Sequence, residues 1–216
     1  MDSPPEHGRR WPHVKNSGLL LRQQPILQVF FMIDPYNKIL AELQALGQGI
    51  VAIDGRCGSG KTNLGNFLKK NLSCNLVHMD DFYLPLPRRE EHWREHPGKN
   101  MDFDRLIQQV LEPAAQGAPI RFAPFDCAGG DYGQEILLSP KPLTILEGSY
   151  SQFPLLRPYY NIMYFLTCSP EVQKRRLQSR EGAKYPMFQA LWIPLEEKYL
   201  ALYPPEGAVL DTGGLF

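Results

Sequence analysis

The sequence has no excess of charge of either sign. Its 216 residues include 23 Lys and Arg and 23 Asp and Glu, a formal net charge of zero. Proteins that mainly bind nucleic acid or an anionic membrane usually carry a basic surplus. We therefore expect neither partner, and an anionic ligand must be held by charges placed locally. The chain is long enough for one domain with a well-buried core.

The sequence also lacks the cysteine patterns of a disulfide framework or a zinc site. Its four cysteines form no C-x-x-C pair and have no histidines at zinc-ligand spacing. Cys57 lies inside a glycine-rich loop, where a disulfide would block a ligand. This pattern predicts a reduced protein in the cytoplasm.

No uninterrupted apolar run is long enough to cross a bilayer. The most apolar early segment, residues 19–33, is broken by Arg22 and Pro25, and no clear secretory signal precedes it. An organelle transit peptide stays open as an alternative, although acidic residues near the start argue against one. We predict that residues 1–31 are a poorly ordered N-terminal extension and that residues 32–216 form the folded domain.

From residue 34 onward, short apolar runs alternate with helix-period patterns. Strands separated by helices predict βαβ units and a mainly parallel sheet flanked by helices, an α/β fold in three layers. Right-handed crossovers then place a ligand at the carboxyl ends of the strands. The predicted strands are residues 49–54, 75–80, 143–148, 161–167 and 208–211.

Helix starts are predicted at Asp34, Asp104 and Ser169, because these residue types cap helix N-termini. The last helix carries three aromatic residues that we predict to be core, with a kink or restart at Pro194. These aromatic residues are Trp192, Tyr199 and Tyr203.

The strongest signal is the stretch GRCGSGKT, which matches G-x-x-x-x-G-K-[S/T] at Gly55, Gly60, Lys61 and Thr62. Glycines allow consecutive backbone N–H groups to surround phosphate oxygens, and the helix that follows adds its positive N-terminus. Lys61 would reach the β- and γ-phosphates, and the Thr62 hydroxyl would bind Mg²⁺. The stretch predicts a nucleotide-binding loop, with candidate residues Gly55, Gly58, Ser59, Gly60, Lys61, Thr62 and Asn63.

Three motifs of other nucleotide-binding classes are absent. The chain has no N-K-x-D motif for reading guanine, no L-S-G-G-Q signature of transporter ATPases, and no Asp-Glu pair at the end of the 143–148 strand. Together these absences favour a small-molecule kinase over a GTPase, a transporter or a motor ATPase.

Four further segments resemble the uridine kinase family of P-loop kinases. They are HMDDFYLP (78–85), ILEGSYS (145–151), RRLQSREG (175–182) and WIPLEEKY (192–199), and the resemblance extends over roughly residues 34–211. It implies a P-loop kinase domain with ATP as phosphoryl donor and Mg²⁺ as cofactor. The choice between ATP and GTP, and the oligomeric state, stay open.

The resemblance also implies roles for single residues. Asp80 corresponds to the family's acid that orients or deprotonates the acceptor hydroxyl and touches the metal, with Asp81 as its rival. Glu147 corresponds to the metal-facing glutamate, so Thr62, Asp80 and Glu147 are the candidate metal ligands. Arg176 and Arg180 resemble the lid arginines that clamp phosphates. The catalytic candidates are therefore Asp80, Lys61 and Arg176.

The acceptor signal is weaker. The resemblance implies substrate contacts for Asp80, Tyr83, Asp102 and Phe125, but the base-reading His and Arg of nucleoside kinases are replaced by residues 127–132, CAGGDY. We expect a kinase that phosphorylates a hydroxyl of a small metabolite, most simply the 5′-OH of a nucleoside such as uridine or cytidine. A sugar, glycerate or pantothenate-like acceptor, or a non-catalytic nucleotide-binding regulator, remains as an alternative.

Overall fold

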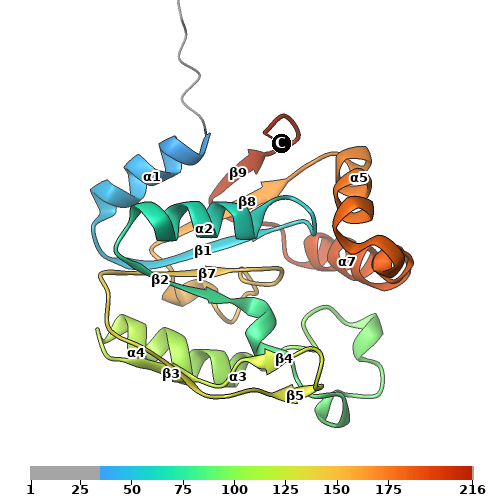
Figure 1. The fold of residues 1–216 in the computed structure, drawn as a ribbon, viewed down its shortest axis with the longest axis horizontal. Coiled ribbons are helices and arrows are strands. Elements are labelled where there is room, and N and C mark those ends of the chain that lie inside the picture. The colour runs from blue at the N-terminus through green and yellow to red at the C-terminus, as the bar shows by residue number, and fades with distance from the viewer. Residues whose placement is uncertain (1–34, 216) are drawn as a thin grey trace, which may run out of the picture. The chain divides into compact units, whose positions relative to one another are not determined.

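The computed structural model describes residues 35–215 and has at its centre a five-stranded sheet of order β2-β7-β1-β8-β9 (Figure 1). Every pairing in this sheet is parallel, which confirms the expected α/β fold. The strands are β1 (Gly49–Gly55), β2 (Cys74–His78), β7 (Leu143–Glu147), β8 (Ile162–Thr167) and β9 (Ala208–Asp211).

One predicted strand is shorter than expected. Strand β2 ends at His78, and the next four residues, Met79–Phe82, form a 3-10 turn instead of continuing to residue 80. The reason is the partner strand: His78 pairs with Glu147, where β7 ends, so there is no backbone beyond this point for the strand to pair with.

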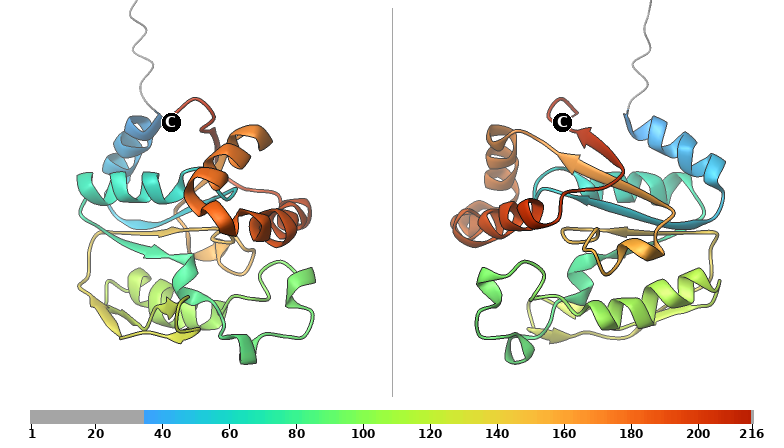
Figure 2. Two further views of the ribbon diagram at one scale, coloured as in Figure 1. Left: turned by 45° about the vertical axis from the view of Figure 1, so that its right-hand side comes forward. Right: turned by 180° about the vertical axis from the view of Figure 1, so that it is seen from behind.

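Helices cover both faces of the sheet (Figures 1 and 2). Helices α1 (Pro35–Leu46) and α2 (Lys61–Asn71) pack on one face, in a core that includes Val51 and Ile53 of β1. Ile50 points into the core of the opposite face, which contains residues of a second helical stretch. That stretch consists of α3 (Phe103–Leu106), a π-helical turn (Ile107–Leu111) and α4 (Glu112–Ala115).

Helix α5 (Pro170–Glu181) and helix α7 (Ile193–Leu202) lie beside the carboxyl ends of the central strands (Figures 1 and 2). Between them are the short α6 (Tyr185–Met187) and a π-helical turn (Phe188–Trp192). Both π-helical turns of the described chain run into a proline in the first turn of the next α-helix. A wider turn accommodates a residue that cannot donate the usual backbone hydrogen bond, and the predicted restart at Pro194 is confirmed.

Two small antiparallel sheets were not anticipated from the sequence. Strand β3 (Ile120–Phe122) pairs with β6 (Ile136–Leu138), and β4 (Phe125–Asp126) pairs with β5 (Asp131–Tyr132). Their strands are two or three residues long, too short for an alternating pattern to be recognised. The remaining short elements are 3-10 turns at Leu86–Arg88, Trp93–Glu95, Arg157–Tyr159 and Gly182–Lys184.

Two details of the expected helices change. Ser169 caps α5 as predicted, but the cap of α3 is Asp102, whose side chain accepts a hydrogen bond from the backbone N–H of Arg105 at 3.2 Å. Asp104 was wrong as a cap because it already lies in the first helical turn. Of the three aromatic residues predicted as core, only Tyr199 is buried; Trp192 and Tyr203 are half-buried.

The expected extension at residues 1–31 and the expected cap Asp34 lie outside the described residues. Within residues 35–215, no helix has the length and apolar character needed to cross a membrane.

The junction between β1 and the loop that follows it yields a stability prediction. A Cβ atom on Gly55 would lie 2.2 Å from the carbonyl oxygen of Leu166, whereas a Cβ on Gly117, which also has a positive φ, meets nothing within 4 Å. In urea unfolding, Gly117→Ala should lower the free energy of unfolding by about 1–2 kcal/mol, which is the cost of placing an alanine in a left-handed conformation. Gly55→Ala should cost at least about 2 kcal/mol more, because rigid neighbouring backbone must move. Equal losses would contradict this account of the junction.

Candidate active site

The loop between β1 and α2 is shaped by three glycines with positive φ: Gly55 at 151°, Gly58 at 75° and Gly60 at 95°. Helix α2 begins at Lys61, and no side chain caps its first turn. An uncapped helix N-terminus presents backbone N–H groups and the positive end of the helix dipole to an anion. The predicted loop therefore has a geometry that can hold phosphate.

Lys61 lies beneath this loop and is buried. Its ammonium donates hydrogen bonds to the carbonyl oxygens of Gly55, at 2.7 Å, and Arg56, at 3.0 Å. Ser59 is also buried, and its carbonyl accepts a hydrogen bond from the hydroxyl of Thr212 at 2.7 Å. The Ser59 side chain thus lies on the inner side of the loop, whereas Thr62 and Asn63 are exposed.

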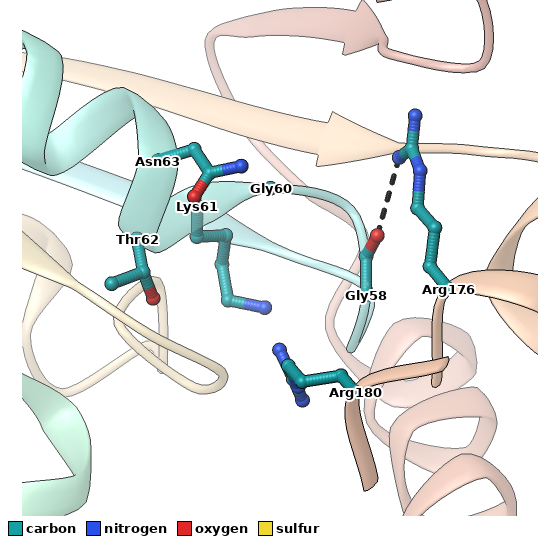
Figure 3. A pocket seen from close by; sticks show the side chains of 7 residues that line it. All are labelled: Gly58, Gly60, Lys61, Thr62, Asn63, Arg176 and Arg180. Atoms are coloured by element: carbon teal, nitrogen blue, oxygen red, sulfur yellow. Dashed lines mark hydrogen bonds between the residues drawn. The ribbon is translucent and has the colours of Figure 1, made fainter. Parts of the chain in front are cut away.

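A pocket of about 260 Å³ opens beside the loop (Figure 3). Arg176 donates to the Gly58 carbonyl at 3.2 Å and to the Thr212 carbonyl at 2.7 Å. In Figure 3 the Arg180 guanidinium turns toward the space in front of the Lys61 ammonium, while Arg176 turns toward Gly58. The residues that line the pocket are Gly58, Gly60, Lys61, Thr62, Asn63, Arg176 and Arg180.

Two predicted metal ligands, Thr62 and Glu147, lie together. The Thr62 hydroxyl donates to Glu147 Oε1 at 3.1 Å, and the same oxygen lies 2.5 Å from Nδ1 of His78. This hydrogen bond is the main reason that the pKa of His78 is raised. Residues 35–215 contain no group of three or more acidic, His or Cys side chains that could hold a metal by themselves. A buried carboxylate beside a hydroxyl still fits Mg²⁺, which takes few protein ligands and keeps waters and phosphate oxygens.

The 3-10 turn after β2 carries Asp80 and Asp81. Desolvation by the surrounding protein raises the pKa of both carboxyl groups, and the charge of Glu147 raises that of Asp80 further. A hydrogen bond with Tyr83 acts in the opposite direction on Asp80. Asp80 is nevertheless open to solvent within a cavity, so it can meet a ligand.

That cavity, of about 730 Å³, brings together residues that are far apart in the sequence. The loop contributes Lys61 and Thr62, and the strand ends contribute Asp80 and Glu147. Its aromatic lining consists of Tyr83, Phe125, Tyr150, Phe188 and Trp192. Its other acidic lining residues are Asp81, Asp126, Glu181 and Glu196.

Of the predicted substrate residues, Asp80, Tyr83 and Phe125 line this cavity, and the rings of Tyr83 and Phe125 meet edge to face at 6.0 Å. Asp102 is not among the lining residues. It caps α3 and accepts a hydrogen bond from the Tyr132 hydroxyl at 3.2 Å. Its expected contact with a sugar hydroxyl stays a prediction.

Several of the lining residues were missed by sequence reasoning, and three of them come from one segment. Phe188, Trp192 and Glu196 all reach the cavity from the π-helical turn and α7. The signal was present, since Trp192 and Glu196 belong to the WIPLEEKY segment. Periodicity favoured core packing there, because the π-helical turn that points Trp192 at the cavity cannot be read from apolar spacing.

No family model matches the chain. It is 30% identical over 166 residues to nicotinamide riboside kinase 2 of Mus musculus, covering 68% of this chain and 82% of that protein. It is 24% identical to a cytidylate kinase of Pyrobaculum calidifontis, covering 71% and 74%.

Solved structures show the same fold. A uridine kinase candidate from Bacillus stearothermophilus superposes with a TM-score of 0.60 at 20% identity, over 82% of this chain and 97% of that one. A circularly permuted P-loop kinase candidate from Saccharomyces cerevisiae gives 0.62 at 12% identity, over 82% and 99%.

A buried carboxylate, Asp54, supports the loop from behind. It accepts hydrogen bonds from the N–H of Gly55 at 2.6 Å, the N–H of Gln152 at 2.9 Å and the Tyr199 hydroxyl at 2.7 Å. Burial raises the pKa of Asp54, and these three hydrogen bonds partly oppose the rise. Stability from this group is therefore complete below the unfolded pKa and is lost as pH rises through the folded value.

Tyr199→Phe should remove one of these bonds and raise the Asp54 pKa further. We expect a loss of about 1–3 kcal/mol in unfolding free energy at a pH above the Asp54 pKa, where the carboxyl is charged. The loss should be smaller at a pH below that pKa, where the carboxyl is protonated. Tyr203→Phe, on the same helix end, is the control. A loss that is the same at both pH values would contradict the role given to the hydroxyl.

Proposed function

The chain belongs to the uridine kinase-like family of P-loop kinases, and we propose that it transfers the γ-phosphoryl group of ATP to the ribose 5′-hydroxyl of a nucleoside in a Mg²⁺-dependent reaction. One observation carries the proposal: Lys61 and Thr62 of the phosphate loop line the same cavity as the acid Asp80 and a set of aromatic rings. The donor phosphates, the general base Asp80 and the acceptor can therefore meet in one cavity.

On the donor side, the loop and the N-terminus of α2 would hold the phosphates. Lys61 would exchange its two carbonyl partners for phosphate oxygens as ATP enters. We assign the second phosphate-facing cation to Arg180, which turns toward the space in front of Lys61 (Figure 3). Arg176 lines the same pocket and would reach a phosphate only by leaving the Gly58 carbonyl. Fixed positive charge of this kind supplies most of the catalysis of phosphoryl transfer.

Thr62, Glu147 and Asp80 would hold Mg²⁺ with waters and phosphate oxygens completing its shell. When bound, the ion would neutralise charge on the transferred phosphoryl group. The hydrogen bond between Thr62 and Glu147 at 3.1 Å keeps their oxygens together in its absence.

Asp80 would accept the proton of the acceptor hydroxyl. A general base works best when its pKa lies near the working pH, and desolvation shifts the pKa of Asp80 upward in that direction. Tyr83, which hydrogen-bonds to Asp80, would keep the carboxylate oriented toward the acceptor.

The charge of the cavity favours a nucleoside over a nucleotide as acceptor. Apart from Lys61 and Arg180 at the donor end, its described lining contains no Lys or Arg, whereas Asp81 and Asp126 add negative charge near Phe125. A phosphomonoester would be repelled there, while the rings of Tyr83, Phe125 and Trp192 can stack on a planar base. Of the acceptors named in two relatives, cytidylate carries a phosphate and nicotinamide riboside does not.

An ATP-consumption screen tests the proposed acceptor class. The panel holds uridine, cytidine, nicotinamide riboside, cytidylate, sugars and hydroxy acids, with Lys61→Ala as the blank. We expect a nucleoside to be the best acceptor, with kcat/KM at least about ten-fold above cytidylate, since repulsion of about 1.4 kcal/mol gives that ratio. A preference for cytidylate, or for a sugar or hydroxy acid, would overturn the nucleoside assignment while leaving the kinase in place.

Substitutions at the acid pair test the mechanism. Asp80→Asn should leave ATP binding intact and lower kcat by about 10²–10⁴-fold, the range for loss of a general base. Asp81→Asn is the matched control and should retain most activity. If Asp81→Asn gives the large loss instead, the base has been assigned to the wrong residue. Near-normal turnover by Lys61→Ala would contradict the donor site itself.

A further inference from the structure

Glu196 is a buried carboxylate that has no part in the proposed phosphoryl transfer, so its hydrogen bonds need another explanation. It lies on α7 and is only 5% exposed. One carboxylate oxygen accepts the backbone N–H of Cys57, in the phosphate loop, at 2.5 Å. The other accepts the side-chain amide of Gln173, on α5, at 3.0 Å. A charge is buried only where hydrogen bonds compensate it, so this residue joins three separate segments.

The hydrogen bonds of Gln173 strengthen this cluster of Glu196, Gln173 and Cys57, which we call the Glu196 junction. Its amide also donates to the carbonyl of Cys57 at 3.1 Å, so α7 and α5 hold the same loop residue. Arg176 and Arg180 follow one and two turns later on α5, and Arg176 contacts the neighbouring Gly58. The position of the arginine-bearing helix over the loop therefore depends on the Glu196 junction.

Helix α7 also borders the aromatic lining of the large cavity. Trp192 lies four residues before Glu196, one helical turn away, and both side chains line the large cavity. The ring of Trp192 packs against those of Tyr83 and Trp93, with ring centroids 6.3 Å and 5.9 Å apart. A shift of α7 would therefore move the Trp192 ring and the Cys57 amide together.

We propose that Glu196 is a positioning residue that couples the phosphate loop to the aromatic wall of the acceptor cavity, so that nucleotide in the loop sets the position of Trp192. The proposal rests on the donor half of the proposed function, and it requires no particular acceptor. Burial first, and then the charge of Glu196, raise the pKa of Cys57 to about 12. The thiol of Cys57 thus stays neutral beside the carboxylate, and its sulfur accepts a hydrogen bond from the Gln173 amide at 3.4 Å.

Trp192 itself can report the coupling. In a protein carrying Trp11→Phe and Trp93→Phe, Trp192 is the only remaining tryptophan of three. A non-hydrolysable ATP analogue with Mg²⁺ should then change its fluorescence. Adding Glu196→Gln should remove most of this change, while calorimetry still detects nucleotide binding.

Glu197→Gln is the matched control. Glu197 is the next residue, is exposed, and pairs with Arg56 without touching the loop backbone. It should keep the full fluorescence change. Glu196→Asp, which retains the buried charge but withdraws it by one methylene, serves if Glu196→Gln does not fold, and it should lose the change as well.

Several results would overturn the coupling. These are an unchanged response in the Glu196 variants, an equal loss in Glu197→Gln, no response in the parent protein, or a complete loss of nucleotide binding with Glu196→Asp, which would make the residue part of the donor site. A failure to find a nucleoside acceptor leaves this test unaffected, because only nucleotide is added.

Discussion

The conformation of the loop at residues 55–60 is the constraint on which the rest of the structure depends. Backbone N–H groups must turn toward an anion, and this requires left-handed glycines that have no side chains to hold them in place. Two buried carboxylates supply the support: Asp54 accepts the N–H of Gly55, and Glu196 accepts the N–H of Cys57. Asp54 belongs to β1, directly before the loop, whereas Glu196 belongs to α7 and lies 139 residues after Cys57.

The acidic groups and the Lys61 ammonium occupy distinct positions around the loop. Asp54 is buried next to the loop, the ammonium of Lys61 lies beneath it, and the acids Asp80 and Glu147 line the same cavity as Lys61. In the proposed function, the cation and the general base would thus lie in one cavity before substrates arrive, which limits the reorganisation needed during transfer. In the proposed function, the negative lining away from the loop would disfavour an acceptor that already carries a phosphate.

The parts of the fold with strong local patterns could be predicted from the sequence. The five parallel strands and the glycine loop followed by α2 appeared at the expected places. Lys61, Thr62, Asp80 and Glu147 line one cavity, and the roles that the resemblance implies for them stay predictions. Trp192 and Glu196 could not be placed, because their direction depends on a π-helical turn and on contacts distant in the sequence. The two small antiparallel sheets were missed because strands of two or three residues carry no periodicity.

The central claim is that the γ-phosphoryl group of ATP is transferred to a hydroxyl of a small-molecule acceptor and not to water. Phosphorus NMR of a complete reaction, with the best acceptor in excess over ATP, tests this most directly. The account predicts one new phosphomonoester signal for each ADP formed, with little inorganic phosphate. ADP accompanied only by inorganic phosphate would show that the site hydrolyses ATP, and the assignment of Asp80 as the base for an acceptor hydroxyl would then be wrong.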